Sequence, residues 1–358
     1  LSATGVEEYN QCHFKYFCEK FLNIRKREKI ELDNRISGDM IHECFSGVLR
    51  NTDKETFIKM TPDELQKQIK ECADNYFNEK LGGDFGKNFS FNFIFQKIVE
   101  GLLIVFIHLQ QEFMATSFTP VGFEVELERK YSLRLDFDNC HSLYFGGKID
   151  RADTCTIGDK KYLRIIDYKS SRKLINPENL AGGINLQMLL YLFVATQKNG
   201  IFKDCIPAGV LYSPIYPEED KASINSALKS TGLILGQHKV LDAMETGVKG
   251  EFVPVNFVKP TKTNPQGIGA NSMCIDSDGM EWLKNYVYAK LKEMAELLLS
   301  GNVEAIPQCI NNKVPCDYCD YVNICDNSML TRYRKPDTKI INEISGIMSN
   351  RLEEMEEN

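Results

Sequence analysis

Two short stretches decide the fold: 146–151, which is GGKIDR, and 165–171, which is IIDYKSS. Side chains at positions i and i+2 of a β-strand lie on the same face of the sheet, so Asp167 and Lys169 point together. If the preceding strand pairs antiparallel with this one, Asp150 joins them on that face. The sequence therefore predicts two carboxylates and a lysine together at one end of a sheet.

These three side chains have the chemistry of phosphodiester hydrolysis. Two carboxylates and a backbone carbonyl are hard oxygen ligands suited to Mg²⁺ or Mn²⁺, which would lower the pKa of an attacking water that the lysine orients. A surface ion pair is the commoner origin of a D-x-K pattern. The apolar residues Leu163, Ile165 and Ile166 favour the site, because an aspartate and a lysine on a buried strand need each other or a metal.

The flanking sequence predicts an α/β fold with a mixed sheet flanked by helices. Period-two alternation predicts an antiparallel meander and one later strand, over 122–135, 142–153, 161–169 and 208–212. Three- and four-residue spacing predicts helices over 6–23, 61–80, 91–116, 184–198 and 279–300, with further helices after Gly38 and from Ile340. We divide this one compact domain into a helical part carrying Cys12 and His42, a core, and C-terminal helices with a cysteine-rich loop, at 1–118, 119–258 and 259–358.

Composition excludes some functions. The 358 residues are 43% hydrophobic, enough for a full core, and the net charge of −7 requires any nucleic-acid surface to be local. No run of about 18 apolar residues occurs and the first helix is charged, so we expect a cytoplasmic protein with no membrane span and no secretory signal. No G-x-x-x-x-G-K-[ST] motif occurs, so nucleotide hydrolysis is not assigned to this chain.

Cysteines are unusually frequent, at 12, and in a chain without an export signal clustered cysteines predict a metal centre. Cys316, Cys319 and Cys325 form a C-x₂-C-x₅-C pattern within one loop. A fourth ligand is needed: Cys309 is the local candidate, which would complete a zinc knuckle, and Cys12 is the distant one. We interpret the other cysteines as packing or surface thiols.

With these motifs the chain resembles the RecB-like nucleases of the PD-(D/E)XK superfamily, and most closely the nuclease domains of the AddB-type subunits of bacterial helicase-nucleases. The similarity covers nearly the whole chain. Besides the cysteine segment, it rests on the motifs LSATGVE at 1–7, CHFKYF at 12–17, GDMIH at 38–42, GKIDR at 147–151, IDYKSS at 166–171, LQMLLY at 186–191 and PAGVLY at 207–212.

The resemblance implies roles for single residues. It makes His42, Asp150 and Asp167 ligands of Mg²⁺ or Mn²⁺, and it makes Lys169 the catalytic lysine. A lone histidine on an apolar helix is commonly a core residue, so the role of His42 depends on the family match. The resemblance also completes the cysteine site with Cys12 and gives it a [4Fe-4S] cluster, with Zn²⁺ as the alternative.

Further residues are expected near the site. Gln187 and Tyr191 match the Q-x-x-x-Y pair of the family, which faces the active site, although polar pairs four residues apart are common on helices. Glu124 falls where relatives often carry an acidic residue, but three alternating glutamates are also typical of a solvent-facing strand. Arg151 is a candidate for contact with the scissile phosphate. Basic residues that are candidates for other phosphate contacts are Arg25, Lys26, Arg27, Lys29, Arg172 and Lys173.

We therefore expect a metal-dependent DNA nuclease domain that prefers single strands and works with an AddA-type helicase-nuclease subunit in the processing of double-strand breaks. Two alternatives stay open. One is a stand-alone RecB-like exonuclease of the Cas4 type, and the other is a catalytically silent scaffold that binds DNA ends. Metal-dependent cleavage would separate the enzymes from the scaffold.

Overall fold

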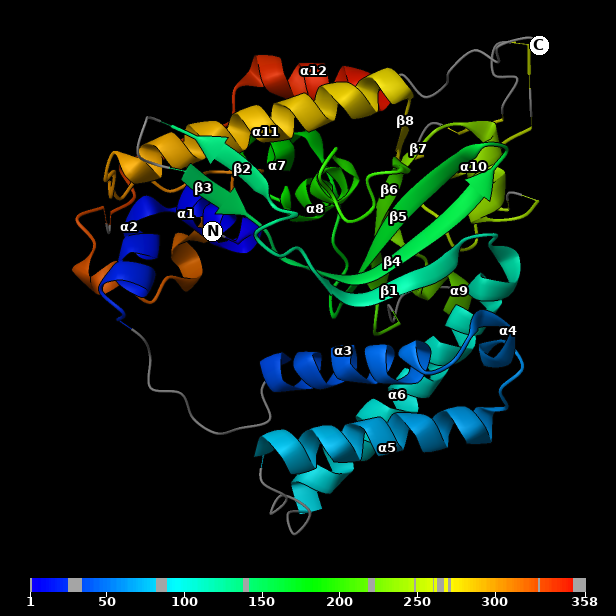
Figure 1. Cartoon of the computed structure of the whole chain (residues 1–358). Helices are drawn as coiled ribbons and strands as arrows, with labels where there is room; N and C mark the ends of the chain where they lie inside the picture. The colour runs from blue at the N-terminus through cyan, green and yellow to red at the C-terminus, as the bar shows by residue number, and fades with distance from the viewer. Residues whose placement is uncertain are drawn as a thin grey trace.

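The computed structural model describes residues 2–24, 34–81, 89–137, 142–217, 223–247, 249–259, 261–262, 267–269, 272–327 and 329–349. Its centre is a six-stranded mixed sheet in the order β1-β4-β5-β6-β7-β8 (Figure 1). β1, β4 and β5 pair antiparallel, β6 is parallel to β5, β7 is antiparallel to β6, and β8 is parallel to β7. These strands are Thr119–Glu126, Lys148–Ile157, Lys160–Lys169, Cys205–Pro214, Thr231–Leu235 and Cys274–Ile275. The predicted α/β class is confirmed.

The predicted meander is wrong in one respect, because its first two strands are each divided. β2 (Leu133–Asp136) and β3 (Ser142–Phe145) form a separate two-stranded ribbon. A turn follows β1, where the backbone N–H of Ser132 donates to Glu128 O at 3.0 Å. Gly146 separates β3 from β4, and a Cβ there would lie 2.4 Å from Leu127 O. The chain therefore leaves the main sheet between β1 and β4.

Helices cover both faces of the sheet (Figure 1). On one side α3 (Asn34–Arg50), α5 (Pro62–Leu81) and α6 (Phe89–Ala115) form a helical layer, and on the other lie α8 (Gln187–Thr196), α11 (Ser277–Leu299) and α12 (Thr338–Ser349). Shorter helices are α4 Lys54–Phe57, α7 Pro177–Ala181, α9 Ile224–Ala227 and α10 His238–Met244. The predicted capping box before α5 is present, since Thr61 N–H donates to Glu64 Oε2 at 2.8 Å and Glu64 N–H donates to Thr61 Oγ1 at 3.3 Å.

The predicted helix over 6–23 is interrupted. The chain forms α1 (Ala3–Gln11), α2 (His13–Tyr16) and a π-helical turn, Phe17–Phe21. The break lies at Cys12, whose φ of −162° and ψ of 114° are extended. The first two helices lie beside the cysteine-rich segment, which contains two 3₁₀ turns, Pro315–Tyr318 and Val322–Ile324 (Figure 1).

One helix segment, Phe93–Ala115 of α6, is long and apolar enough to cross a membrane by length and composition, with a mean hydropathy of 1.6. Half of the most apolar 18-residue stretch of this segment is buried inside the protein. Buried side chains along it include Val99, Leu102, Phe106 and Phe113. A core helix has the same composition, and the expectation of no membrane span stays a prediction.

Candidate active site

The strands β4 and β5 bring the predicted carboxylates together. Their register pairs Arg151 with Ile166, so the next position sets Asp150 opposite Asp167. The backbone N–H of Tyr168 donates to Asp150 Oδ2 at 3.0 Å, which fixes this carboxylate at the end of β5. The arrangement is the one expected from the period-two pattern of the two strands.

Lys169 lies on the same face as Asp167. Its Nζ is 2.6 Å from Asp167 Oδ2, and the side chains are 31% and 7% exposed. Burial and the charge of Asp150 raise the pKa of Asp167, while the charge of Lys169 opposes the rise. Two carboxylates are thus crowded at a site where one ammonium offsets only part of their charge.

A histidine and a glutamate complete this group. His42 Nδ1 of α3 lies 3.1 Å from Asp150 Oδ2. Ligand atoms of His42, Glu124 and Asp150 all lie within 4.8 Å of one another. Burial alone would lower the pKa of His42, but the hydrogen bond to Asp150 and the charges of Asp150 and Asp167 outweigh burial and raise the pKa. A nitrogen and two carboxylates therefore converge in a group that could hold a metal ion.

Glu124 is held in an unusual backbone conformation. Its φ is +53°, in the left-handed region that residues other than glycine rarely adopt. The register pairs Phe123 with Arg151 and Val125 with Ile149, so Glu124 lies between two pairs of the ladder. Its carboxylate forms an ion pair with Lys148. Strained backbone conformations of this kind cluster at functional sites. Here the strained residue carries a carboxylate close to Asp150.

Tyr168 points to the opposite face of β5 from Asp167 and packs against α3. Its ring stacks on Phe45 at a centroid distance of 3.9 Å and an interplanar angle of 9°. Phe45 is three residues from His42 on α3, and the His42 and Tyr168 rings meet edge to face at 6.2 Å. The stacked rings therefore set the distance between the imidazole and the end of β5. The sequence alone gave no indication of this contact, because it joins segments more than 120 residues apart.

The prediction for Arg151 is wrong. Arg151 is 1% exposed and lies on the opposite face of the sheet, because neighbouring residues of a strand alternate between faces. Its guanidinium donates to Tyr168 Oη at 2.9 Å, to Asp153 Oδ2 at 3.1 Å and to Glu112 Oε1 at 3.3 Å. Arg164 donates to the same Asp153 and Glu112 oxygens at 3.0 and 2.8 Å. This buried network of two arginines and two carboxylates anchors α6 to the sheet and is not available to DNA.

The structure brings the Q-x-x-x-Y pair to the site. Gln187 Nε2 donates to Tyr191 Oη at 3.3 Å. The Tyr191 ring occupies the space beside Gly147, where a Cβ would lie 2.0 Å from the Tyr191 hydroxyl. Burial raises the pKa of Tyr191, and so does the charge of Asp167. Glycine at 147 is therefore what allows α8 to approach the start of β4.

One side chain near the site, that of Tyr212, was not singled out from the sequence, and Lys173, a predicted phosphate contact, lies close to it. Tyr212 of β6 lies directly opposite Asp167 in the parallel ladder, and its buried hydroxyl has no hydrogen-bond partner among the described residues. Lys173 Nζ lies 5.3 Å from the centroid of the Tyr212 ring, and its charge lowers the pKa of Asp167. A second ammonium therefore faces the carboxylates, besides that of Lys169. The predicted phosphate contacts Arg25, Lys26, Arg27 and Lys29 lie outside the described residues.

The cysteine-rich segment packs on the start of the chain. Burial raises the pKa of Cys316 to about 11, with further contributions from the charges of Cys12, Cys319 and Cys325. Burial also raises the pKa of Cys12, again with contributions from Cys319 and Cys325. The four predicted ligands are thus electrostatic neighbours.

Backbone and side-chain contacts hold the two ends together. Gln308 N–H donates to Gln11 O at 2.8 Å, and Tyr321 Oη donates to Ile24 O at 2.6 Å. A fifth thiol, Cys18, lies in the π-helical turn and is fully buried. Burial raises its pKa, and the charges of Cys319, Cys12 and Cys325 add to the rise. Cys18 is thus buried, as the interpretation as a packing or surface thiol allows, and it also lies near the predicted ligands Cys12, Cys319 and Cys325.

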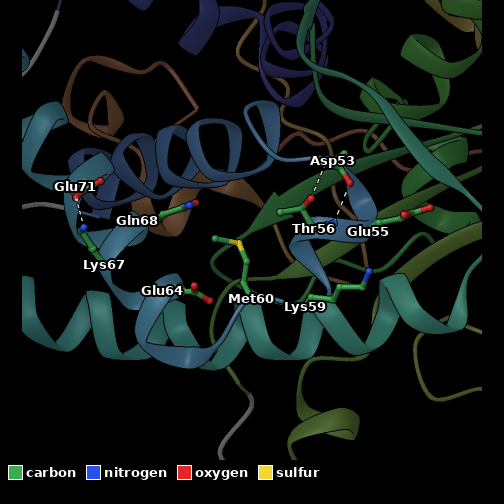
Figure 2. A pocket seen from close by; sticks show the side chains of 9 residues that line it. All are labelled: Asp53, Glu55, Thr56, Lys59, Met60, Glu64, Lys67, Gln68 and Glu71. Atoms are coloured by element: carbon green, nitrogen blue, oxygen red, sulfur yellow. Dashed lines mark hydrogen bonds and ion pairs between the residues drawn. The ribbon is translucent and has the colours of Figure 1, made fainter.

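A hollow of about 670 Å³ lies elsewhere, between α4 and α5 (Figure 2). Thr56 N–H donates to Asp53 Oδ1 at 3.0 Å, and Lys67 Nζ lies 4.0 Å from Glu71 Oε1. These four polar side chains thus form two pairs, and none of the lining residues belongs to the carboxylate site. The lining residues are Asp53, Glu55, Thr56, Lys59, Met60, Glu64, Lys67, Gln68 and Glu71.

The sheet, its flanking helices and the Asp-x-Lys strand agree with the comparison with protein families. Residues 1–326 match the PD-(D/E)XK nuclease superfamily. The chain belongs to this superfamily.

Curated relatives are the B-type subunits of bacterial ATP-dependent helicase/deoxyribonucleases. The protein from Clostridium perfringens is 26% identical over 351 residues, which cover 91% of this chain, and the one from Clostridium novyi is 26% identical over 96% of it. The protein from Staphylococcus saprophyticus is 26% identical over 95% of this chain. The match covers 30% to 32% of these relatives. The chain is therefore homologous to a part of AddB subunits, and that part is C-terminal.

Proposed function

We propose that the chain is a divalent-metal-dependent deoxyribonuclease, the nuclease domain of an AddAB-type helicase-nuclease. The observation that carries the proposal is the group formed by His42, Glu124 and Asp150, with Asp167 and Lys169 beside it at the end of β5. Superfamily membership and deoxyribonuclease relatives support the same reaction.

The donor set fits Mg²⁺ or Mn²⁺. Carboxylate oxygens are the preferred ligands of both ions, and an imidazole is acceptable to Mn²⁺. The raised pKa of Asp167 indicates negative charge that the protein itself leaves partly uncompensated. We assign Asp150, Asp167 and His42 as ligands, with Glu124 as a further carboxylate. A bound cation supplies Lewis acidity, which lowers the pKa of a water and offsets charge on the phosphate.

The chain's own residues position water and DNA. Lys169 Nζ is held by Asp167 and can donate to the attacking water or to a phosphate oxygen. Lys173 supplies a second ammonium for the DNA backbone, and Gln187 and Tyr191 offer an amide and a hydroxyl next to Asp167. Lys169, Lys173 and Gln187 are half-buried and Tyr191 is buried. Their position at the end of the sheet favours a single strand, which can reach carboxylates that a blunt duplex cannot.

We assign Cys12, Cys316, Cys319 and Cys325 to a [4Fe-4S] cluster. Cys319 and Cys325 both contribute to the raised pKa values of Cys12 and Cys316, and thiols that come together from both ends of the described chain fit one shared centre. Such a centre fastens α1 to the C-terminal segment and has a structural role. Iron and sulfide analysis of the purified protein tests this assignment, and one zinc per chain without iron would overturn it.

We infer the complete protein assembly by analogy with the relatives. We place this domain beside an AddA-type subunit, in the cytoplasm, acting on DNA during break processing. A stand-alone exonuclease of the Cas4 type would use the same residues, so the partner has to be tested by co-purification. A silent DNA-end scaffold would bind DNA but leave it intact.

The deciding experiment is cleavage of end-labelled single-stranded DNA by the purified protein with Mg²⁺, Mn²⁺ or EDTA. We expect cutting with either ion, none with EDTA, and none by Asp150→Ala. Asp159→Ala is the matched control, because Asp159 is an exposed aspartate in the turn between β4 and β5, at the other end of the same hairpin. Binding without cleavage by the native protein would support the scaffold.

A further inference from the structure

Helix α8, which carries Gln187 and Tyr191, begins without a cap of its own. The residue before it, Leu186, makes no side-chain hydrogen bond to the helix, and the first turn contains no acidic residue. The first backbone N–H groups of a helix need acceptors from outside it, since they have none within it. At a buried helix end this need has to be met by another segment.

Glu7 of α1, which is 180 residues away in the sequence, supplies an acceptor for the start of α8. Gln187 N–H donates to Glu7 Oε1 at 2.8 Å. Burial raises the pKa of Glu7, and the charge of Lys173 and the backbone N–H groups of Gln187, Asn185 and Leu186 oppose the rise. Glu7 is only 9% exposed. A buried carboxylate aimed at a helix N-terminus is favoured both by the hydrogen bonds and by the helix dipole.

The same carboxylate lies beside the active site. Its charge acts on the hydroxyls of Tyr191 and Tyr212, and the charge of Lys173 acts on it. Tyr191 fits against Gly147 with no space for a Cβ, so a small shift of α8 would move its hydroxyl relative to Asp167. The position of the first turn of α8 therefore matters to the site.

We propose that Glu7 is a positioning residue for the nuclease reaction, which holds Gln187 and Tyr191 in place by capping α8. The inference rests on the proposed function. Glu7 lies on α1, the helix that ends at Cys12. Through Glu7, the end of the chain that carries a cysteine ligand is therefore joined directly to the helix that faces the carboxylates.

The test compares Glu7→Leu with Glu7→Gln. Leucine keeps the volume but accepts no hydrogen bond, whereas glutamine keeps one acceptor oxygen. We expect kcat on single-stranded DNA to fall about tenfold in Glu7→Leu, because Gln187 and Tyr191 lose their fixed position, and to stay within about threefold in Glu7→Gln. Tyr191→Phe combined with Glu7→Leu is expected to be no slower than the slower single variant, because both changes act through the same hydroxyl.

Asp276→Ala is the matched control. Asp276 Oδ1 accepts from Gly279 N–H at 2.7 Å and caps α11, so this variant loses a comparable cap away from the carboxylates. We expect a comparable fall in Tm with an unchanged kcat. Loss of kcat in proportion to Tm across all variants, or independent effects of Glu7→Leu and Tyr191→Phe, would overturn the inference.

Hydrogen exchange gives a readout that does not depend on cleavage. Exchange at residues 185–191 is expected to quicken in Glu7→Leu and to stay unchanged in Asp276→Ala. If the native protein cuts DNA but Glu7→Leu cuts equally well, the inference fails while the proposed function stands. If the native protein cuts no DNA, the proposed function fails, and exchange then decides only whether Glu7 holds α8.

Discussion

Replacement of Asp167 by asparagine should make the metal-free protein more stable while abolishing cleavage. Asp167 is 5% exposed, and burial and the charge of Asp150 raise its pKa. A raised pKa means that folding disfavours the ionised form, so the free energy of unfolding falls as pH rises from the ordinary carboxyl range, about 4, through the raised pKa. Asparagine keeps the shape of the side chain and removes this penalty.

The size of the gain follows from the surroundings. The raised pKa reports a net penalty on the ionised form that asparagine removes, and we expect a gain of only about 1 kcal/mol, because Lys169 at 2.6 Å already offsets part of the penalty and, being partly exposed, stays solvated when its partner is lost. For a chain of 358 residues, an unfolding entropy of about 2.1 cal/mol/K per residue converts 1 kcal/mol into a rise in Tm of roughly 1 to 2 °C.

The assay is thermal unfolding of both proteins in EDTA and in Mg²⁺ across a series of pH values. In EDTA at neutral pH, Asp167→Asn should melt higher, and the difference should fade as the pH falls toward about 4. Saturating Mg²⁺ should reverse the order, because a ligand at about 100 times its Kd stabilises the native protein by about 2.7 kcal/mol and the variant lacks a ligand. A lower Tm of Asp167→Asn in EDTA at neutral pH would refute the reasoning.

Three further outcomes are expected. Lys173→Ala should weaken binding of single-stranded DNA and reduce the slope of log K against log salt by about 1, measured by fluorescence anisotropy, because one phosphate contact is lost; an unchanged slope would contradict it. Cys12→Ser should bleach the brown visible absorption of the protein and lower its free energy of unfolding by about 3 kcal/mol, whereas Cys309→Ser should do neither; the reverse result would assign Cys309 as the ligand. Gly147→Ala should lower the free energy of unfolding by about 1–3 kcal/mol and slow cleavage, because its Cβ would overlap Tyr191; normal Tm and rate would contradict the close approach of α8.

The pattern within single strands was enough to predict that Asp150, Asp167 and Lys169 lie together. Period-two alternation placed Asp167 and Lys169 on one face, and an antiparallel pairing placed Asp150 with them. The same alternation would also have placed Arg151 correctly, because it follows Asp150 by one residue and must face the other side. The error came from treating closeness in sequence as closeness in space.

Other features of the fold and the site could not be predicted, because they depend on contacts between residues far apart in the sequence or on backbone conformations that local spacing does not indicate. The cap that Glu7 gives to α8 joins residues 180 apart, and Tyr212 meets Asp167 only because β6 pairs parallel to β5. The left-handed backbone of Glu124 is not indicated by its alternation with Glu126. The break at Cys12 interrupts a helix that periodicity alone predicts as continuous.

The most direct test of the central claim measures cleavage and metal binding in the same samples. Single-turnover cleavage of end-labelled single-stranded DNA would be followed for the native protein, Asp167→Ala and Asp159→Ala, with bound Mn²⁺ measured by electron paramagnetic resonance. We predict that the native protein and Asp159→Ala bind Mn²⁺ and cut, and that Asp167→Ala cuts nothing and binds Mn²⁺ more weakly. Metal-dependent cleavage by folded Asp167→Ala would contradict the assignment of the nuclease site to these carboxylates.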